Sequence, residues 1–370
     1  MERKAQKCKQ CGREIYFDGI CVSCRAENER NRILAMSDEE VAGSVRQICR
    51  EIQSTGQLEE NEALFRKLLN YREIDTSKIA VAAFEKGLFA PCELYKDAPE
   101  DVTKAMIALA EQEEINPSLA GNLLLCLAVR GGDDVFRTFL ELEKRPRKWR
   151  KSLYVDPSVY AAYGGWSYDG DGRKIKTNFE SCYPMVKGTL EEKERSPVKI
   201  GVPAGERCPQ CDCALVNLME IDCRDPRLAF LGIDGVIKAK CCPNCFPYAE
   251  DYFCRYTIDG ESEILCEESP AAMENLFGDE GIQELSSNLY RLGDSPVPLR
   301  YAADWEGGSS VGGFGFWIQD CEIKRCPQCG KPMTYLAQIQ WDTVLEGMEG
   351  NAYIELCKDC KRIAILHQQT

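Results

Sequence analysis

The pattern of apolar and polar positions between residues 37 and 153 is typical of amphipathic helices. In the first of them, apolar side chains recur every three or four residues, at Val41, Val45, Ile48 and Ile52. Ser37 and Glu40 have the spacing of a capping box at the start of this helix. The pattern predicts an all-helical middle domain over 37–153, with one buried face on each helix.

Two segments of this region resemble each other. Residues 82–87 and 127–132 lie about 45 residues apart and both end in glycine, which is close to the period of HEAT-like helical repeats. A stacked array of HEAT-like repeats and an ordinary small helical domain both fit this pattern.

After residue 153 the sequence changes to aromatic residues, glycines and the alternating pattern of strands. Residues 154–198 are predicted to form a hairpin followed by a solvated linker, and residues 199–370 a β-rich domain. With the segment before the helices, residues 1–36, the chain is predicted to be an α+β multidomain protein.

The 22 cysteines change this picture most, because twelve of them form three sets of paired Cys-x-x-Cys knuckles. The sets are Cys8, Cys11, Cys21 and Cys24; Cys208, Cys211, Cys242 and Cys245; and Cys326, Cys329, Cys357 and Cys360. Two knuckles joined by a strand, a turn and a strand bring four thiolates together in the tetrahedral cage that zinc prefers. A short zinc ribbon is therefore predicted over 1–36, with strands around the Asp18-Gly19 turn.

The second and third sets share more than cysteines. Residues 215–221 occupy the place of residues 333–339, and each second knuckle follows a strand, over 236–240 or 352–356. Each copy is expected to pair its two strands so that its four sulfurs converge. This predicts a duplicated pair of zinc ribbons in the C-terminal domain.

The chain has a single histidine, His367, so mixed cysteine and histidine cages are nearly excluded. Closed four-thiolate sites lack the open position of a catalytic zinc, and three structural ions are expected. Iron also suits tetrahedral sulfur. Cys213 and Cys241 are adjacent thiols that offer substitutes for Cys211 and Cys242, which are preferred because they keep the two-residue spacing.

Charge and hydropathy restrict the compartment and the partners. The 46 basic and 60 acidic side chains give a net charge of −14, which favours a basic partner over a polyanion. The longest apolar run, 123–129, is too short for a membrane span. No apolar leader follows Met1, so a cytoplasmic protein with reduced cysteines is expected.

A glycine-rich loop before the last cysteine set carries a family resemblance. Residues 311–320, Val-Gly-Gly-Phe-Gly-Phe-Trp-Ile-Gln-Asp, lead into Cys326-Pro327-Gln328-Cys329. Together they resemble the C-terminal part of the YwqG-like family of unknown function, and are distantly similar to the programmed cell death family of zinc proteins. The resemblance covers about residues 200–370 and implies a similar fold and a binding module. Gly315 and Phe316 depart from the family's proline position.

Two roles are open for this loop, whose candidate interaction residues are Gly312, Gly313, Phe314, Trp317 and Gln319. The glycines permit a backbone turn closed to other residues, and the aromatic rings provide apolar contact. The loop either packs the junction between the two copies or forms a peptide-binding surface.

Three function classes are compared. A non-catalytic zinc protein that binds another protein, as a chaperone or immunity-like module, is favoured by the helical repeats and the acidic charge. The alternative is RNA binding through the basic run that contains Arg147, Lys148, Trp149 and Arg150, in which Trp149 would stack on a base. The same run is also typical of a solvated helix end. An enzyme is not expected, because no nucleophile motif or phosphate-binding loop occurs.

Overall fold

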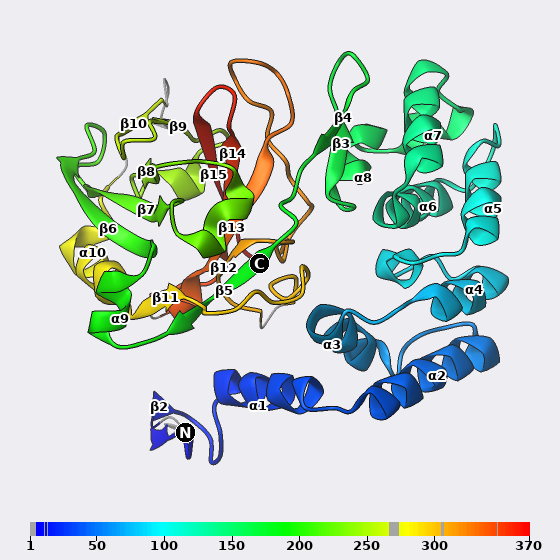
Figure 1. The fold of residues 1–370 in the computed structure, drawn as a ribbon, viewed down its shortest axis with the longest axis horizontal. Coiled ribbons are helices and arrows are strands. Elements are labelled where there is room, and N and C mark those ends of the chain that lie inside the picture. Colours follow the sequence, from blue (N-terminus) through cyan, green and yellow to red (C-terminus); the bar gives the residue numbers. More distant parts are fainter. Residues whose placement is uncertain (1–4, 11, 13, 266–273, 305–306, 346) are drawn as a thin grey trace.

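The computed structural model describes residues 5–10, 12, 14–265, 274–304, 307–345 and 347–370. Figure 1 shows the helices of residues 38–144 in succession on one side of the molecule and the two larger sheets on the other. The predicted ligand Cys11 lies outside the described residues, and so does Cys266.

The N-terminal segment differs from the predicted zinc ribbon. Strand β1 (Gln6–Lys7) pairs antiparallel with β2 (Glu14–Ile15), so the hairpin encloses the first knuckle and does not join the two knuckles. Helix α1 (Val22–Leu34) then begins directly after Cys21, whose sulfur accepts the N–H of Cys24 as the helix cap. The prediction of a strand after the Asp18-Gly19 turn was wrong, because residues 22–34 form helix α1 in its place.

The helical region agrees with the pattern of apolar positions. Its elements are α2 (Asp38–Thr55), α3 (Glu62–Arg72), α4 (Ser77–Lys86), η1 (Cys92–Tyr95), α5 (Glu100–Ala110), α6 (Pro117–Arg130), α7 (Asp133–Lys144), η2 (Lys148–Ser152) and α8 (Pro157–Ala162). The capping box of Ser37 and Glu40 is confirmed. Nearly all of the apolar run 123–129 is buried inside α6. None of the helices in the described residues is long and apolar enough to cross a bilayer.

The predicted aromatic hairpin forms, and it packs against the helices. Strand β3 (Trp166–Tyr168) pairs with β4 (Lys174–Lys176). The Trp166 indole N–H donates to the carbonyl of Ala128 at 2.9 Å, and its ring meets Phe139 edge-on at 5.1 Å. The hairpin therefore shares the hydrophobic core of the helical region.

The rest of the chain forms two sheets around a second core. A three-stranded sheet has the order β6 (Val198–Arg207), β7 (Ala214–Asp222), β8 (Val236–Cys241). An eight-stranded sheet has the order β10 (Ser262–Ile264), β9 (Phe253–Tyr256), β15 (Arg362–Gln368), β14 (Asn351–Cys357), β13 (Thr334–Gln340), β12 (Ser310–Gly312), β5 (Cys182–Lys187), β11 (Tyr290–Leu292). The shorter helices here are α9 (Leu190–Arg195), η3 (Pro226–Leu231), η4 (Phe246–Tyr248), α10 (Gly278–Ser287) and η5 (Trp341–Thr343).

The predicted boundary at residue 199 was wrong in two respects. Strand β5 lies inside the eight-stranded sheet, between β12 and β11, so the sheet domain begins before the supposed linker. The linker itself contains α9, an exposed helix with a capping box between Thr189 and Glu192. The charged run Glu191 to Arg195 is solvated, as expected, but it is helical.

The two cysteine-bearing hairpins match position for position. Strand β7 leaves the second set's first knuckle and pairs with β8, and β13 leaves the third set's first knuckle and pairs with β14. The strand pairing that the sequence predicted is confirmed. Each pair also has one register shift, between Asn217 and Met219 in one copy and between Tyr335 and Ala337 in the other. Each shift begins nine residues after its first cysteine, which supports a duplication.

Candidate metal centres

The first knuckle of each set has the same local geometry. The residue after its second cysteine has a left-handed backbone: φ is 74° at Gly12, 57° at Asp212 and 67° at Gly330. The N–H of that residue donates to the carbonyl of the set's first cysteine, at 2.9–3.0 Å in all three. In the second and third sets this tight turn accompanies the convergence of both knuckle thiols on one cluster, which four-sulfur coordination requires.

The second set closes into a compact cluster, the Cys208 cluster (Cys208, Cys211, Cys242, Cys245). All four sulfurs lie within 4.8 Å of one another. The distance between sulfurs is 3.9 Å for Cys208 and Cys245, 3.5 Å for Cys211 and Cys242, and 3.4 Å for Cys211 and Cys245. Zinc–sulfur bonds of about 2.3 Å place tetrahedral sulfurs about 3.8 Å apart, whereas a disulfide needs about 2.05 Å. The cluster therefore fits a metal ion better than a disulfide.

Position favours Cys211 and Cys242 over their neighbouring thiols as ligands. Cys213 and Cys241 lie outside the cluster, which contains Cys211 and Cys242. The Cys213 thiol lies 3.6 Å from the carbonyl of Ala214, to which it can donate. Burial raises the pKa of the Cys241 thiol well above its usual value. Both are core residues beside the cluster.

The third set forms the Cys326 cluster (Cys326, Cys329, Cys357, Cys360), again with all sulfurs within 4.8 Å. The Cys329 and Cys357 sulfurs are 3.9 Å apart. Cys326 and Cys357 are buried, Cys360 is half-buried and Cys329 is exposed. The cage has the dimensions of the Cys208 cluster and is more open to solvent.

At the N-terminus, Cys8, Cys21 and Cys24 converge and are buried. The Cys8 and Cys24 sulfurs are 3.9 Å apart, and the backbone N–H of Cys21 donates to the Cys8 sulfur at 3.2 Å. Cys21 is also the N-cap of α1, where its sulfur accepts the backbone N–H of Cys24 at 3.4 Å. The fourth predicted ligand, Cys11, is outside the described residues.

The remaining described cysteines form no such cluster. Cys126, Cys182, Cys223, Cys254 and Cys321 are buried, and Cys49 and Cys92 are half-buried. Burial raises the pKa of both Cys182 and Cys223 to about 12. These thiols are small core side chains.

The glycine loop before the third set is packed rather than free. A Cβ at Gly312 would lie 2.1 Å from the carbonyl oxygen of Ser181, and one at Gly313 would lie 2.4 Å from that of Leu299. The Trp317 ring stacks on Tyr353 at 4.2 Å. Phe314 is half-buried, and the exposed side chain of Gln319 donates to the carbonyl of Gln369 at 3.0 Å. The contacts favour the packing role over the peptide-binding role.

The basic run does not present Trp149 for base stacking. Trp149 is 4% exposed, and its indole N–H donates to the carbonyl of Gln112 at 2.9 Å. The Arg147 Nε donates to the carbonyl of Glu111 at 2.9 Å, and Lys148 pairs with Glu114 at 2.6 Å. Arg150 pairs with Asp156. The hypothesis that Trp149 stacks on a base was wrong, because Trp149 is buried. The side chains of this run bind the loop between α5 and α6.

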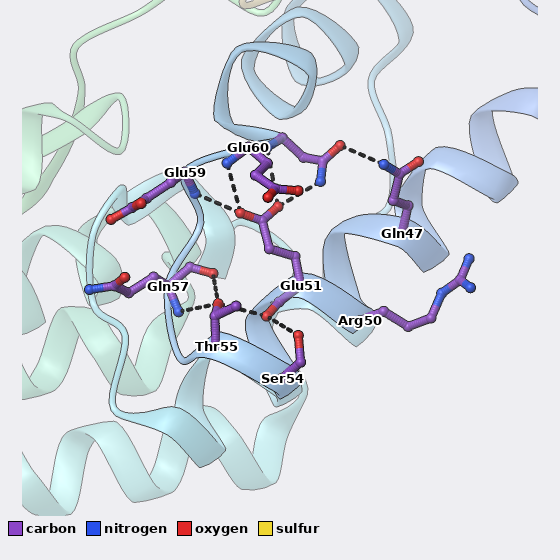
Figure 2. A pocket seen from close by; sticks show the side chains of 9 residues that line it. Gln47, Arg50, Glu51, Ser54, Thr55, Gln57, Glu59 and Glu60 are labelled. Carbon is purple, nitrogen blue, oxygen red and sulfur yellow. Dashed lines mark hydrogen bonds between the residues drawn. The ribbon is translucent and has the colours of Figure 1, made fainter.

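One surface hollow, a space of about 500 Å³ beside α2, was not predicted from the sequence. Figure 2 shows the Glu51 carboxylate directed at the chain that enters α3. It accepts the backbone N–H groups of Glu59, Glu60 and Asn61 at 2.7–3.1 Å, and the Asn61 side-chain amide at 2.6 Å. These hydrogen bonds occupy the groups that would bind a ligand, so Glu51 is a structural residue.

Asn244 is a second residue whose role was missed. It lies inside the second knuckle of the Cys208 cluster, and its side chain accepts the N–H groups of Leu276 and Phe277 at 3.0 and 3.1 Å. The signal for this role in the sequence was an asparagine between the two cysteines of a knuckle. Its partners are over 30 residues away, so the contact could not be predicted.

Comparison with known proteins places the chain beside one uncharacterised relative. The protein YpfL of Salmonella typhimurium is 29% identical over 295 residues, which cover 77% of this chain and 66% of YpfL. The match thus spans slightly less than two thirds of the relative's length. No family model and no solved structure matches the chain. The YwqG-like resemblance and the distant one to the programmed cell death family therefore stay predictions.

Proposed function

We propose that the chain is a non-catalytic zinc protein whose three cysteine sets hold structural ions, and that it works by binding another protein. The observation that carries the metal proposal is the Cys208 cluster, in which four buried sulfurs converge within 4.8 Å. Soft thiolates in a tetrahedral arrangement suit zinc, and iron is the competing ion.

A zinc ion would cross-link the two knuckles of each set. In the Cys208 cluster the ligands Cys208 and Cys211 precede β7, and Cys242 and Cys245 follow β8, so the ion would fasten one end of that hairpin. Structural zinc sites contribute an apparent ~10–16 kcal/mol to folding in small zinc-binding peptides. Four protein ligands leave no position for a reacting water, which supports a structural role over catalysis.

Elemental analysis tests the metal. Protein purified under reducing conditions is expected to carry three zinc ions per chain and to melt at a lower temperature after chelation. Iron in place of zinc would correct the identity of the ion. A metal-free protein whose melting temperature is unchanged by chelator would refute the proposal.

The charge distribution supports a basic protein as partner. Residues 154–370 hold 34 acidic and 21 basic side chains, whereas residues 1–36 hold 5 acidic and 8 basic ones. A basic partner would be attracted to the sheet-rich part, since association is steered by complementary charge. The row of helices would then act as a HEAT-like support, and chaperone or immunity-like activity is the proposed form of this binding.

Capture from native lysate tests the partner. One stoichiometric basic protein, retained at about 0.05 M salt and weakened at about 0.5 M where charges are screened, is expected. Recovery of bulk RNA alone would favour the nucleic-acid alternative, although the buried Trp149 does not support it. Recovery of neither would remove the binding role and leave the metal proposal to its own test.

A further inference from the structure

The two C-terminal clusters differ in solvent access although their folds match. In the Cys208 cluster the four cysteines are 1–8% exposed. In the Cys326 cluster Cys329 is exposed and Cys360 is half-buried. Because a thiolate must meet its reagent to react, the difference in access predicts a difference in reactivity.

The segment of residues 274–277, called the cover, is hydrogen-bonded to the second knuckle of the Cys208 cluster. The Asn244 side chain accepts two backbone N–H groups from residues 276 and 277 and donates to the carbonyl of Glu274 at 3.1 Å. Asn244 itself is 5% exposed. The Cys242 N–H donates to the buried hydroxyl of Tyr252 at 2.9 Å, which closes the cluster from another direction.

The corresponding position of the Cys326 cluster is open. Asp359 lies two residues after Cys357, as Asn244 lies two residues after Cys242, and it is exposed. Its carboxylate pairs with Lys331, a residue of the same cluster's other knuckle, at 3.3 Å. In the part of the chain that the structure describes, no distant segment is hydrogen-bonded to Asp359.

An exposed thiolate also needs a neighbour to form a disulfide. The Cys357 sulfur lies 3.9 Å from that of Cys329. A disulfide of about 2.05 Å requires the two sulfurs to approach by a little under 2 Å, a shift that loss of the ion would permit. The Cys326 cluster thus combines an accessible thiolate with a nearby second one.

We propose that Cys329 is an oxidation site at which peroxides release the zinc of the Cys326 cluster, while the Cys208 cluster keeps its zinc. The Cys329 sulfur attacks the peroxide, the O–O bond breaks, and a sulfenic acid and one hydroxide form. The Cys357 sulfur then displaces the second hydroxide, forming the Cys329–Cys357 disulfide. Two sulfurs lose two electrons, the two hydroxides take up two protons to become water, and the zinc leaves with two ligands lost.

This inference rests on the zinc binding proposed above, and the experiment separates the two. Zinc-loaded full-length protein is treated with hydrogen peroxide while a chromogenic chelator reports released zinc, and cysteines are mapped by mass spectrometry at successive times. The metal content is measured first. A Cys326 cluster without zinc at the start would refute the proposed metal function at that site.

With zinc present, the ion of the Cys326 cluster is expected to leave at least about tenfold faster than the ion of the Cys208 cluster. Reaction at the covered thiolates of the Cys208 cluster requires local opening of the structure. The early product should contain Cys329 in a disulfide, with Cys208, Cys211, Cys242 and Cys245 still reduced. Zinc loss from both clusters at equal rates, or oxidation of the Cys208 cluster first, would overturn the inference.

A variant of the cover provides the second measurement. Asn244→Ala removes the hydrogen bonds to residues 274–277 and leaves all twelve ligands in place. Its Cys208 cluster should release zinc faster than that of the unmodified protein, whereas the rate at the Cys326 cluster stays the same. An unchanged rate at the Cys208 cluster would show that this cover does not control access.

Discussion

The guanidinium of Arg30 lies 5.1 Å from the ring centroid of Tyr301, which joins the N-terminal helix to the sheet-rich part of the chain. The same guanidinium lies 5.5 Å from the ring of Tyr71 on α3, whose hydroxyl donates to Asp304 at 2.7 Å. The two rings also contact each other edge-on at 5.4 Å, and a cation beside aromatic rings is stabilising, more so when partly buried. Three segments far apart in the sequence therefore meet at one side chain.

Replacement of Arg30 should loosen this junction. Arg30→Gln is expected to lower the free energy of unfolding by about 1–2 kcal/mol, since each cation–π contact is worth roughly 0.5–2 kcal/mol. Urea denaturation measures the loss, and hydrogen exchange of the α1 amides locates it. Arg32→Gln is the matched control, because Arg32 pairs with Glu29 on the same exposed helix and such pairs contribute little. Equal effects of the two variants would contradict the role of Arg30.

Adjacent cysteines should behave differently at the Cys208 cluster. Cys242→Ala removes a sulfur of the cluster and is expected to cost one zinc ion per chain. The free energy of unfolding should fall by several kcal/mol, in line with the contribution of structural zinc sites. Cys241→Ala leaves the cluster intact and should cost about 1 kcal/mol, as a small cavity does.

Elemental analysis and denaturation of the two variants provide the check. Retention of all zinc by Cys242→Ala, or loss of an ion from Cys241→Ala, would show that the ligand set was assigned wrongly.

The features that were predicted correctly depend on short-range signals. The capping box at Ser37 and Glu40 and the two hairpins β7–β8 and β13–β14 each arise from residues within one continuous segment. In the two C-terminal sets the cysteine spacing indicates which strands pair, because the hairpin between the knuckles brings their sulfurs together. These parts of the fold and of the candidate site could therefore be predicted from the sequence.

The features that were missed depend on distant partners. Strand β5 contains Pro184, which has no N–H and argues against a central strand. Its neighbour β12 is over 120 residues away, and the N–H of Met185 donates to the carbonyl of Ser309 at 2.8 Å. Trp149 was misjudged for the same reason, because its burial depends on the loop that holds Gln112. Local pattern carries no information about such contacts.

Glu51 should make the helical region sensitive to acid. Burial raises the pKa of its carboxyl, but the hydrogen bonds from Asn61, Glu59 and Glu60 outweigh this and lower it. A carboxyl with a lowered pKa stabilises the fold above its unfolded pKa, and this stability is lost as the pH falls through the folded pKa. Glu51→Gln should cost about 1–3 kcal/mol at pH 7, since a hydrogen bond to a charged group is worth about 1.5–3 kcal/mol.

Urea denaturation of the unmodified protein and of Glu51→Gln, each at pH 7 and at pH 3.5, measures this effect. The difference in stability should shrink at the lower pH, which lies below the ordinary carboxyl pKa of about 4.3, because the unfolded chain then binds a proton that the folded chain binds less readily. Glu39→Gln, at an exposed position on the same helix, is the control and should change stability little. If Glu51→Gln lowers the free energy of unfolding by the same amount at both pH values, the loss arises from packing and not from charge.

The single histidine should give the fold a second, milder pH dependence. His367 lies on β15, and its ring meets Phe246, the residue after Cys245, edge-on at 6.2 Å. Burial lowers the pKa of the imidazole, and a hydrogen bond to the backbone of Glu349 offsets this only in part. Between the unfolded pKa of about 6.5 and the lower folded value, the unfolded chain binds more protons, so stability falls as the pH falls through that window.

The midpoint of urea denaturation should therefore drop between pH 7.5 and 5.5 by more in the unmodified protein than in His367→Gln, in which nothing titrates at this position. Proton competition at the cysteine clusters is common to both proteins and cancels in the comparison. Parallel curves for the two proteins would show that this imidazole does not contribute to the pH dependence of folding.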